Sequence, residues 1–438
     1  MNLYSTNNHH LSVPFKDAIF NSLPHDKGLY MPTHIPHLSD HFIKNMASYS
    51  FQQIALEVAG HLLQGAIAHA DLKNIIDDTL NFDAPLVPLA DDTYVLELFH
   101  GPSLAFKDFG ARFMSRVMSY YFLANEKKEL HILVATSGDT GGAVALGFLD
   151  VPNTRVTILF PKGKVSPIQE MQLTTHGKNI CAIEVDGTFD DCQTIVKQAF
   201  IDTELNKTFC LTSANSINIA RLIPQTFYYC YAYAQLQKMG HKDIIFSVPS
   251  GNFGNMAAGV LAWKMGLPVK QFLAATNCND TVPMFLNTGI YQAKPSIQTY
   301  SNAMDVGAPS NWVRIMDMFA QNIDAVKAMI TGYSFSDEAT LQAIDSIYER
   351  HQYLVCPHTA IAWLALKKWQ EKNKKPVVGI FLATAHPCKF SNIFPERLAP
   401  AISIPQEIKA LENKKHKAIP MGKDFMKFKN YLLEAVVA

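Results

Sequence analysis

A single lysine in apolar surroundings is the residue best suited to covalent chemistry. Lys107 stands between Phe106 and Phe109 in the segment Phe99–Arg112, shortly after a His-Gly-Pro turn. Apolar surroundings disfavour the charged form of an amine, so the pKa of such a lysine falls. A neutral amine can attack a carbonyl group and later act as a base. The same pattern is also typical of an amphipathic helix start whose lysine reaches water.

Two glycine-rich turns are candidates for binding an anion. Thr136–Gly142 and Ser250–Asn255 each follow a short apolar run and precede a helical pattern. Backbone N–H groups at such a helix start can bind a carboxylate or a phosphate. An ordinary capped helix, or a tight turn with positive φ, would use the same residue types. The Thr136–Gly142 turn lacks the spacing of a known nucleotide-binding loop.

Two further polar segments could contact a ligand. Ser213–Arg221 combines amides, a hydroxyl and one arginine, which could bind a phosphate or carboxylate bidentately. A helix N-cap followed by a surface arginine is the alternative interpretation. In Leu382–Lys389, Thr384 follows a strand and could form a hydrogen bond with a buried ring nitrogen. His386 and Cys388 lack the spacing of metal ligands, so no metal site is predicted.

The elements that must position these residues alternate between strand and helix. Short apolar strands are expected at 94–98, 131–135, 156–160, 180–185, 243–248 and 377–382, and helices at 51–70, 142–148, 190–200 and 255–265. This alternation predicts an α/β protein with a mostly parallel sheet. Two separate units of strand, glycine turn and helix predict two α/β lobes, with a site between them at the carboxyl ends of the strands.

The length and composition set the domain organisation. The chain has 438 residues, of which 48% are hydrophobic, so a large core in two or three domains is expected. We predict an N-terminal extension of mixed helix and loop over 1–92, a first lobe over 93–230 and a second lobe over 231–438. The tail at 409–429 is expected to be a surface helix and loop.

Charge and cysteine content argue against several classes of protein. Lysine plus arginine equals aspartate plus glutamate, which gives no support to binding nucleic acid or a membrane surface. No apolar run is long enough to span a membrane, and the N-terminus does not read as a secretion signal. Seven scattered cysteines without a Cys-x-x-Cys motif are typical of reduced thiols, which predicts a cytoplasmic protein.

Taken together and in this order, these segments resemble the threonine synthase family, in its longer bacterial and fungal subgroup. Ser301–Asn311 and Cys356–Ala362 carry the same resemblance. The resemblance implies a fold-type-II, tryptophan synthase β-like architecture with pyridoxal 5'-phosphate between the lobes. It further implies a lyase that converts O-phospho-L-homoserine and water into L-threonine and phosphate, the last step of threonine biosynthesis. The only partner implied is this small molecule, bound by a monomer or homodimer.

The resemblance also implies a role for each site residue. Lys107 would hold the cofactor covalently, and Thr384 would face its pyridine nitrogen. Asp139 stands where shorter relatives have an asparagine near the cofactor hydroxyl, so its role is left open between cofactor and substrate. The cofactor phosphate would bind Gly251, Asn252, Phe253, Gly254 and Asn255; the substrate carboxylate Ser137, Gly138, Asp139 and Thr140; the substrate phosphate Asn215, Ser216, Asn218 and Arg221.

Three alternatives remain at this point. A threonine or serine dehydratase of the same fold would not need a phosphate site, whereas Arg221 after an Asn-Ser-Ile-Asn run favours a phosphorylated substrate. A phospho-lyase would release a keto acid instead of threonine. A non-catalytic relative would have a damaged lysine motif, and the segment around Lys107 is intact.

Overall fold

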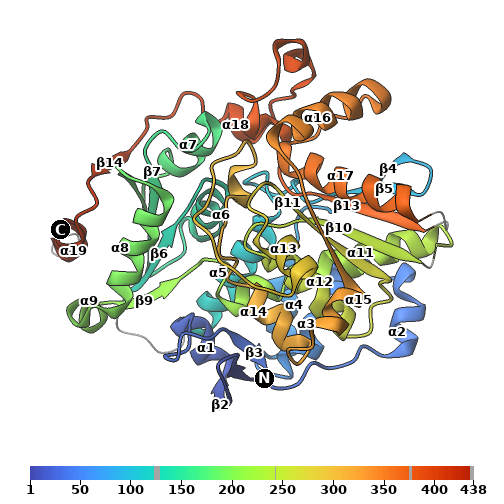
Figure 1. Cartoon of the computed structure of the whole chain (residues 1–438). Coiled ribbons are helices and arrows are strands. Elements are labelled where there is room, and N and C mark those ends of the chain that lie inside the picture. Colours follow the sequence, from blue (N-terminus) through green and yellow to red (C-terminus); the bar gives the residue numbers. More distant parts are fainter. Residues whose placement is uncertain (123–128, 242, 374–376, 435–438) are drawn as a thin grey trace.

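Two sheets of mostly parallel strands form the centre of the molecule. The computed structural model describes residues 1–122, 129–241, 243–373 and 377–434 (Figure 1). The first sheet has the order β14-β8-β7-β6-β9 and the second the order β12-β11-β10-β13-β5-β4. Every neighbouring pair is parallel except β4 and β5. The two expected α/β lobes are therefore confirmed.

The strands of the first sheet are β6 (Leu130–Ala135), β7 (Thr154–Pro161), β8 (Ile180–Val185), β9 (Cys210–Ser213) and β14 (Ala418–Met421); those of the second are β4 (Leu86–Ala90), β5 (Thr93–Glu97), β10 (Ile244–Pro249), β11 (Gln271–Thr276), β12 (Ile330–Ser334) and β13 (Val378–Ala383). Every residue of β6, β10 and β13 is buried. Strands covered by helices on both faces require such unbroken apolar runs. For this reason the sequence indicated these strands to within two residues.

The N-terminal segment contains more strand than expected. β1 (Asn2–Ser5), β2 (Asn8–Pro14) and β3 (Tyr30–Pro32) form an antiparallel sheet of order β2-β1-β3. The prediction of helix and loop alone was wrong here, because β2 is largely exposed and lacks an apolar run. The helical stretch expected at 51–70 is two helices, α3 (Phe51–Leu63) and α4 (His69–Thr79), separated where Gln64 adopts a left-handed conformation with φ 47°.

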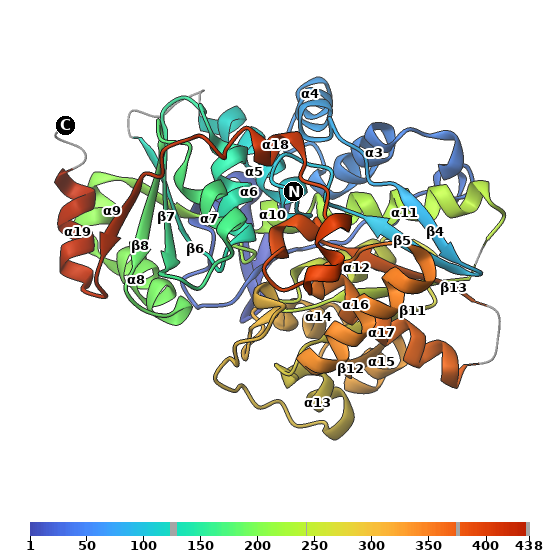
Figure 2. The same cartoon turned by 90° about the horizontal axis from the view of Figure 1, so that it is seen from above.

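The C-terminal tail also contains an unexpected strand. β14 pairs with β8 at the outer edge of the first sheet, and α19 (Phe425–Glu434) packs on the same lobe (Figure 2). Conversely, an early strand belongs to the second sheet: β5 pairs with β13, although it falls within the expected first lobe. The sheets are thus assembled from segments that are not contiguous in the sequence, which differs from the expected division at 93 and 231.

The remaining elements cover the sheets and connect them. They are α1 (Phe15–Asn21), α2 (Asp40–Lys44), α5 (Lys107–Phe122), α6 (Asp139–Phe148), α7 (Pro167–Thr174), α8 (Phe189–Ile201), α9 (Thr203–Thr208), α10 (Ile219–Leu222), α11 (Gln225–Lys238), α12 (Gly254–Lys264), α13 (Thr281–Thr288), α14 (Trp312–Met318), α15 (Ile323–Met329), α16 (Asp337–His351), α17 (Pro357–Lys372), α18 (Gln406–Lys409) and the 3-10 turns at Met46–Ser48, Asn302–Met304, Pro387–Phe390 and Glu396–Ala401. None of the helices in the described ranges has the length and apolar character to cross a membrane.

Candidate active site

Lys107 is the first residue of α5 and lies beside the end of β13. The N–H of Phe106 donates to the carbonyl of Thr384 at 2.9 Å, and Ala105 and Ala385 form an antiparallel bridge. These contacts join two motifs that are far apart in the sequence. Lys107 and Thr384 were both predicted as cofactor residues, and the fold brings their backbones together.

The environment of Lys107 favours a neutral amine. Burial is the main cause that lowers its pKa, from 10.5 to about 8, and the cations Lys389 and Arg221 act in the same direction. The carboxylate of Asp139 opposes this effect without cancelling it. The side chain is only partly exposed. An amine with this pKa has a substantial neutral fraction near physiological pH, as a nucleophile or base requires.

Asp139 begins α6 and forms a buried ion pair. Its Oδ1 lies 2.8 Å from Nζ of Lys389 and accepts a hydrogen bond from Nε2 of Gln169 at 2.9 Å. Burial alone would raise the pKa of Asp139, but the cations Lys389 and Lys107 hold it well below its usual range. Asp139 is therefore a permanent carboxylate in the surroundings of Lys107. Its first-turn position at the N-terminus of a helix also suits a negative charge.

The turn of Ser137, Gly138 and Thr140 is shaped by its neighbours. The N–H groups of Gly138 and Gly141 donate to Oγ1 of Thr136 at 3.0 and 2.9 Å. Gly138 has φ 130°, and a Cβ at this position would lie 2.4 Å from the side chain of Gln169. Only glycine fits here. Asn302 reaches the turn from the other lobe and donates to the carbonyl of Ser137 at 3.4 Å.

The loop Gly251–Asn255 joins β10 to α12 and has the features of a phosphate-binding turn. A Cβ on Gly251 would lie 2.6 Å from Cα of Met304, and Phe253 adopts a left-handed conformation with φ 59°. Gly254 starts α12, where N–H groups are free of intrahelical partners. Asn255 is buried, and its Nδ2 has no partner among the described residues, while its Oδ1 accepts from Tyr228 and Tyr229 at 2.7 Å each. A buried donor without a partner fits a ligand oxygen.

The residues from Asn215 to Arg221 form two groups: Asn215 and Ser216 contact the two glycine turns, whereas Asn218 and Arg221 support the backbone. Nδ2 of Asn215 donates to the carbonyl of Ala135 at 3.0 Å, next to the Ser137 turn. Oγ of Ser216 accepts from Nδ2 of Asn252 at 2.6 Å, which joins the segment to the Gly251–Asn255 loop. Asn218 is completely buried, and its Nδ2 donates to Ile19 at 2.7 Å while its Oδ1 caps α10.

Arg221 supports the backbone around Lys107. Its Nη1 donates to the carbonyl of Ala214, and its Nη2 lies 3.5 Å from the carbonyl of Lys107. Nε is buried without a partner among the described residues and lies where a Cβ on Gly110 would approach to 2.7 Å. Burial lowers the pKa of Arg221 to about 10, so it remains a cation at neutral pH.

Sequence reasoning missed three polar residues of this region. Lys389 is the last residue of the Leu382–Lys389 motif and is completely buried. The sequence did not indicate this burial, because a Pro-Cys-Lys run is typical of a surface turn. Gln169 contacts Asp139 only in the folded protein, because the two residues lie on different helices. His358 lies in the matched segment Cys356–Ala362; burial lowers its pKa to about 4, and its Nε2 accepts the N–H of Ala303 at 3.3 Å.

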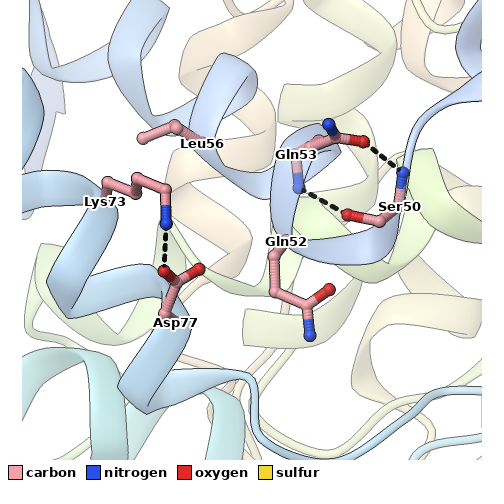
Figure 3. Close-up of a pocket in the computed structure, with 6 residues that line it drawn as sticks. All are labelled: Ser50, Gln52, Gln53, Leu56, Lys73 and Asp77. Atoms are coloured by element: carbon pink, nitrogen blue, oxygen red, sulfur yellow. Dashed lines mark hydrogen bonds and ion pairs between the residues drawn. The ribbon is translucent and has the colours of Figure 1, made fainter.

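The surface hollow in Figure 3 lies elsewhere. It is formed by α3 and α4, and it is lined by Ser50, Gln52, Gln53, Leu56, Lys73 and Asp77. Its polar groups are largely satisfied by the Ser50–Gln53 capping box and the Lys73–Asp77 ion pair. None of the residues predicted to carry chemistry lines it. Within the described residues, no group of three or more His, Cys, Asp or Glu could hold a metal ion.

Comparisons with known proteins cover the whole chain. A family model for pyridoxal-phosphate dependent enzymes matches residues 81–382, and models of the threonine synthase N terminus and C-terminal region match 2–80 and 359–432. Threonine synthase of Haemophilus influenzae is 41% identical, with 99% of this chain and 100% of that protein covered.

Solved structures agree with the sequence comparison. The crystal structure of Escherichia coli threonine synthase has a TM-score of 0.92 at 40% identity, covering 99% of this chain and 100% of that one. A pyridoxal-phosphate-bound threonine synthase from Brucella melitensis has a TM-score of 0.90 at 33% identity, covering 99% and 98%. These likenesses confirm the expected fold class. The chain belongs to the threonine synthase family of pyridoxal-phosphate-dependent enzymes.

Proposed function

We propose that the chain converts O-phospho-L-homoserine and water into L-threonine and phosphate, with pyridoxal phosphate held on Lys107. The observation that carries this proposal is the meeting of a lysine of lowered pKa with Thr384 and with the Asp139 carboxylate at the start of α6. The unpartnered Nδ2 of Asn255 fits the cofactor phosphate, and the backbone at Gly251 packs so closely on Met304 that no side chain can replace the glycine.

Lys107 performs the proton transfers in this proposal. When bound, pyridoxal phosphate supplies the electron withdrawal that makes protons near the substrate amine removable. Once the substrate amine has taken its place on the cofactor, the freed neutral Lys107 amine takes the proton from Cα of the substrate and gives it up before it takes one from Cβ, while the bond from Cγ to the phosphate oxygen breaks and phosphate leaves. One proton is returned to Cγ, water adds its oxygen to Cβ and gives a proton to the departed phosphate, and a proton is returned to Cα, which completes threonine. Arg221 supports the Lys107 carbonyl and so fixes the start of α5 during these steps.

The substrate is held at its two anionic ends. The turn of Ser137, Gly138 and Thr140 presents backbone and hydroxyl donors for the carboxylate, beside the Asp139 that remains ionised. Asn215 and Ser216 border both glycine turns and are proposed to bind the substrate phosphate, with Arg221 adding positive charge. Since the amide of Asn218 is fully engaged within the protein, we propose that it positions this segment.

A phosphate-release assay with product analysis tests the proposal. Purified protein loaded with pyridoxal phosphate is given O-phosphohomoserine, and phosphate and amino acids are measured over time. Equal amounts of phosphate and threonine are expected. Phosphate with 2-oxobutyrate would indicate a phospho-lyase, and turnover of free threonine or serine without phosphate release would indicate a dehydratase.

We further propose a cytoplasmic monomer or homodimer. Cys181, Cys192, Cys230, Cys278, Cys356 and Cys388 are free thiols in the structure, in agreement with a reducing compartment. Sedimentation of the purified enzyme at several concentrations distinguishes the two oligomeric states.

A further inference from the structure

Arg314 is a buried cation whose donors all bind neutral oxygens. It lies on α14, and its side chain is 0% exposed. Nε and Nη2 contact the carbonyl of Tyr30 at 3.3 and 3.2 Å, and Nη2 also donates to Ile217 at 2.6 Å. Nη1 donates to the carbonyl of Ser216 at 3.2 Å and to Oδ1 of Asn311 at 2.7 Å. The hydrogen bonds of the guanidinium are therefore satisfied, but its charge is not.

No carboxylate compensates this charge within the part of the chain that the structure describes. Burial is the sole cause that shifts the pKa of Arg314, lowering it to about 9, so it remains protonated at neutral pH. The buried Lys389, by contrast, is paired with Asp139 at 2.8 Å. An isolated buried charge is costly, and proteins usually provide a counter-ion. For Arg314 that counter-ion must come from outside the described side chains.

The partners of Arg314 lead directly to the Gly251–Asn255 loop. Asn311 donates to the carbonyl of Asn252 from its backbone N–H at 3.2 Å and from Nδ2 at 3.1 Å. Ser216 accepts from Nδ2 of Asn252 at 2.6 Å. A Cβ on Gly254 would lie 3.5 Å from both Ser216 and Asn311. One residue thus separates the guanidinium from the loop, whose Asn255 has the unpartnered buried Nδ2.

We propose that Arg314 is a positioning residue for the Gly251–Asn255 loop. It holds Asn252 through Ser216 and Asn311. It also supplies the positive charge that balances a phosphate monoester dianion bound on this loop. The inference rests on the proposed function, because it requires a phosphorylated cofactor or substrate. Charges in a buried region are screened only weakly, so Arg314 attracts the anion without touching it. Tyr30 belongs to β3, so this arginine also connects the N-terminal sheet to the loop.

Two phosphates could be the dianion, and cofactor binding distinguishes them. Apoenzyme is titrated with pyridoxal phosphate and with pyridoxal, which lacks the phosphate, for the wild type, Arg314→Met and the control Arg397→Met. Arg397 is an exposed arginine paired with Asp345 at 2.5 Å. For Arg314→Met we expect the Kd for pyridoxal phosphate to rise about tenfold or more, and the Kd for pyridoxal to change by less than about twofold. The control keeps both values.

The other outcomes decide the source of the phosphate or reject the proposal. A higher KM for O-phosphohomoserine at saturating cofactor, with unchanged cofactor preference, would assign the substrate phosphate as the dianion. Equal weakening of pyridoxal phosphate and pyridoxal, with unchanged KM, would show a purely structural arginine and overturn the proposal. If Arg314→Met does not fold, Arg314→Lys is used: the proposal requires it to keep the preference for the phosphorylated cofactor, and loss of that preference would overturn it.

The test separates this inference from the proposed function. The wild type prefers pyridoxal phosphate over pyridoxal, and Arg314→Met loses this preference, if the inference is right. If the wild type then releases no phosphate from O-phosphohomoserine, only the proposed reaction is refuted. Normal threonine formation in an enzyme whose phosphate preference and KM ignore Arg314 would refute the inference alone.

Discussion

The ammonium group of Lys389 lies 2.8 Å from Oδ1 of Asp139, and their side chains are 0% and 4% exposed. Lys389 also donates to the carbonyl of Ser103 at 2.9 Å, which ties the turn before Lys107 to the start of α6. The pair therefore connects the lysine segment, the Ser137 turn and the chain after β13 through charge as well as hydrogen bonds.

Removing one partner of this pair is predicted to be strongly destabilising. Lys389→Met leaves the Asp139 carboxylate buried without its cation, so we expect the free energy of unfolding to fall by about 3–5 kcal/mol. The double variant Lys389→Met with Asp139→Asn removes both charges and is expected to recover part of this loss. Urea denaturation of the three proteins measures both effects. A double variant less stable than Lys389→Met would contradict the role of the pair.

The same pair predicts the acid sensitivity of the fold. The pKa of Asp139 is lower in the folded protein than its ordinary value of 3.8, so the folded state binds fewer protons. Its stabilising contribution is complete above about pH 5 and is lost as the pH falls below its unfolded value. Asp139→Asn is therefore expected to lose less stability between pH 5 and pH 3 than the wild type, in thermal unfolding at each pH.

Lys107 is predicted to control cofactor capture through its neutral form. Because its pKa is about 8, the rate at which apoenzyme captures pyridoxal phosphate is expected to rise from pH 7 and level off above about pH 9. Asp139→Asn removes the carboxylate that raises this pKa, which shifts the profile to lower pH. Stopped-flow absorbance near 400 nm measures the rate. Lys107→Ala is expected to lose both this absorbance and turnover, and retained turnover would reject the assignment.

The Gly251 loop provides a test of close backbone approach. Gly251→Ala places Cβ 2.6 Å from Cα of Met304 and 2.8 Å from the carbonyl oxygen of Ala303, so the loop must move. We expect cofactor affinity to fall by at least about tenfold, a cost in the range known for overpacked positions. Gly422→Ala is the matched control, because its Cβ would meet no atom within 4 Å. Titration of both apoenzymes with pyridoxal phosphate gives the comparison.

Arg221 is predicted to affect the substrate more than the cofactor. Arg221→Met removes positive charge near the proposed phosphate site and the contact with the Lys107 carbonyl. A rise in KM for O-phosphohomoserine of about tenfold to a hundredfold is expected, in line with the loss of a charged contact. Cofactor loading, measured by absorbance, is expected to change little. Equal loss of both would assign Arg221 a purely structural role.

The sequence was informative wherever burial imposes a simple pattern. The runs that became β6, β10 and β13 are buried along their whole length because both faces of the sheets are covered, so their positions could be predicted. The two glycine turns followed from the same logic, since each connects a buried strand to a helix.

What the sequence concealed depends on contacts between distant segments. Lys389 looks like a surface residue until Asp139 is brought to it, and Gln169 reaches the same carboxylate from α7. β14 is short and only partly buried, so its edge pairing with β8 could not be distinguished from loop. Arg314 likewise shows its importance only when Tyr30, Ser216 and Asn311 surround it.

The pairing of β14 with β8 has a consequence for biosynthesis of the enzyme. Residues 418–421 leave the ribosome more than two hundred residues after β8, so the nascent first sheet keeps an uncovered strand edge until translation is nearly complete. Open edges invite pairing with other chains. Premature termination shortly before residue 418 would therefore yield chains that retain the Lys107 region yet are prone to aggregate, and chaperone demand during synthesis would be greatest for this lobe.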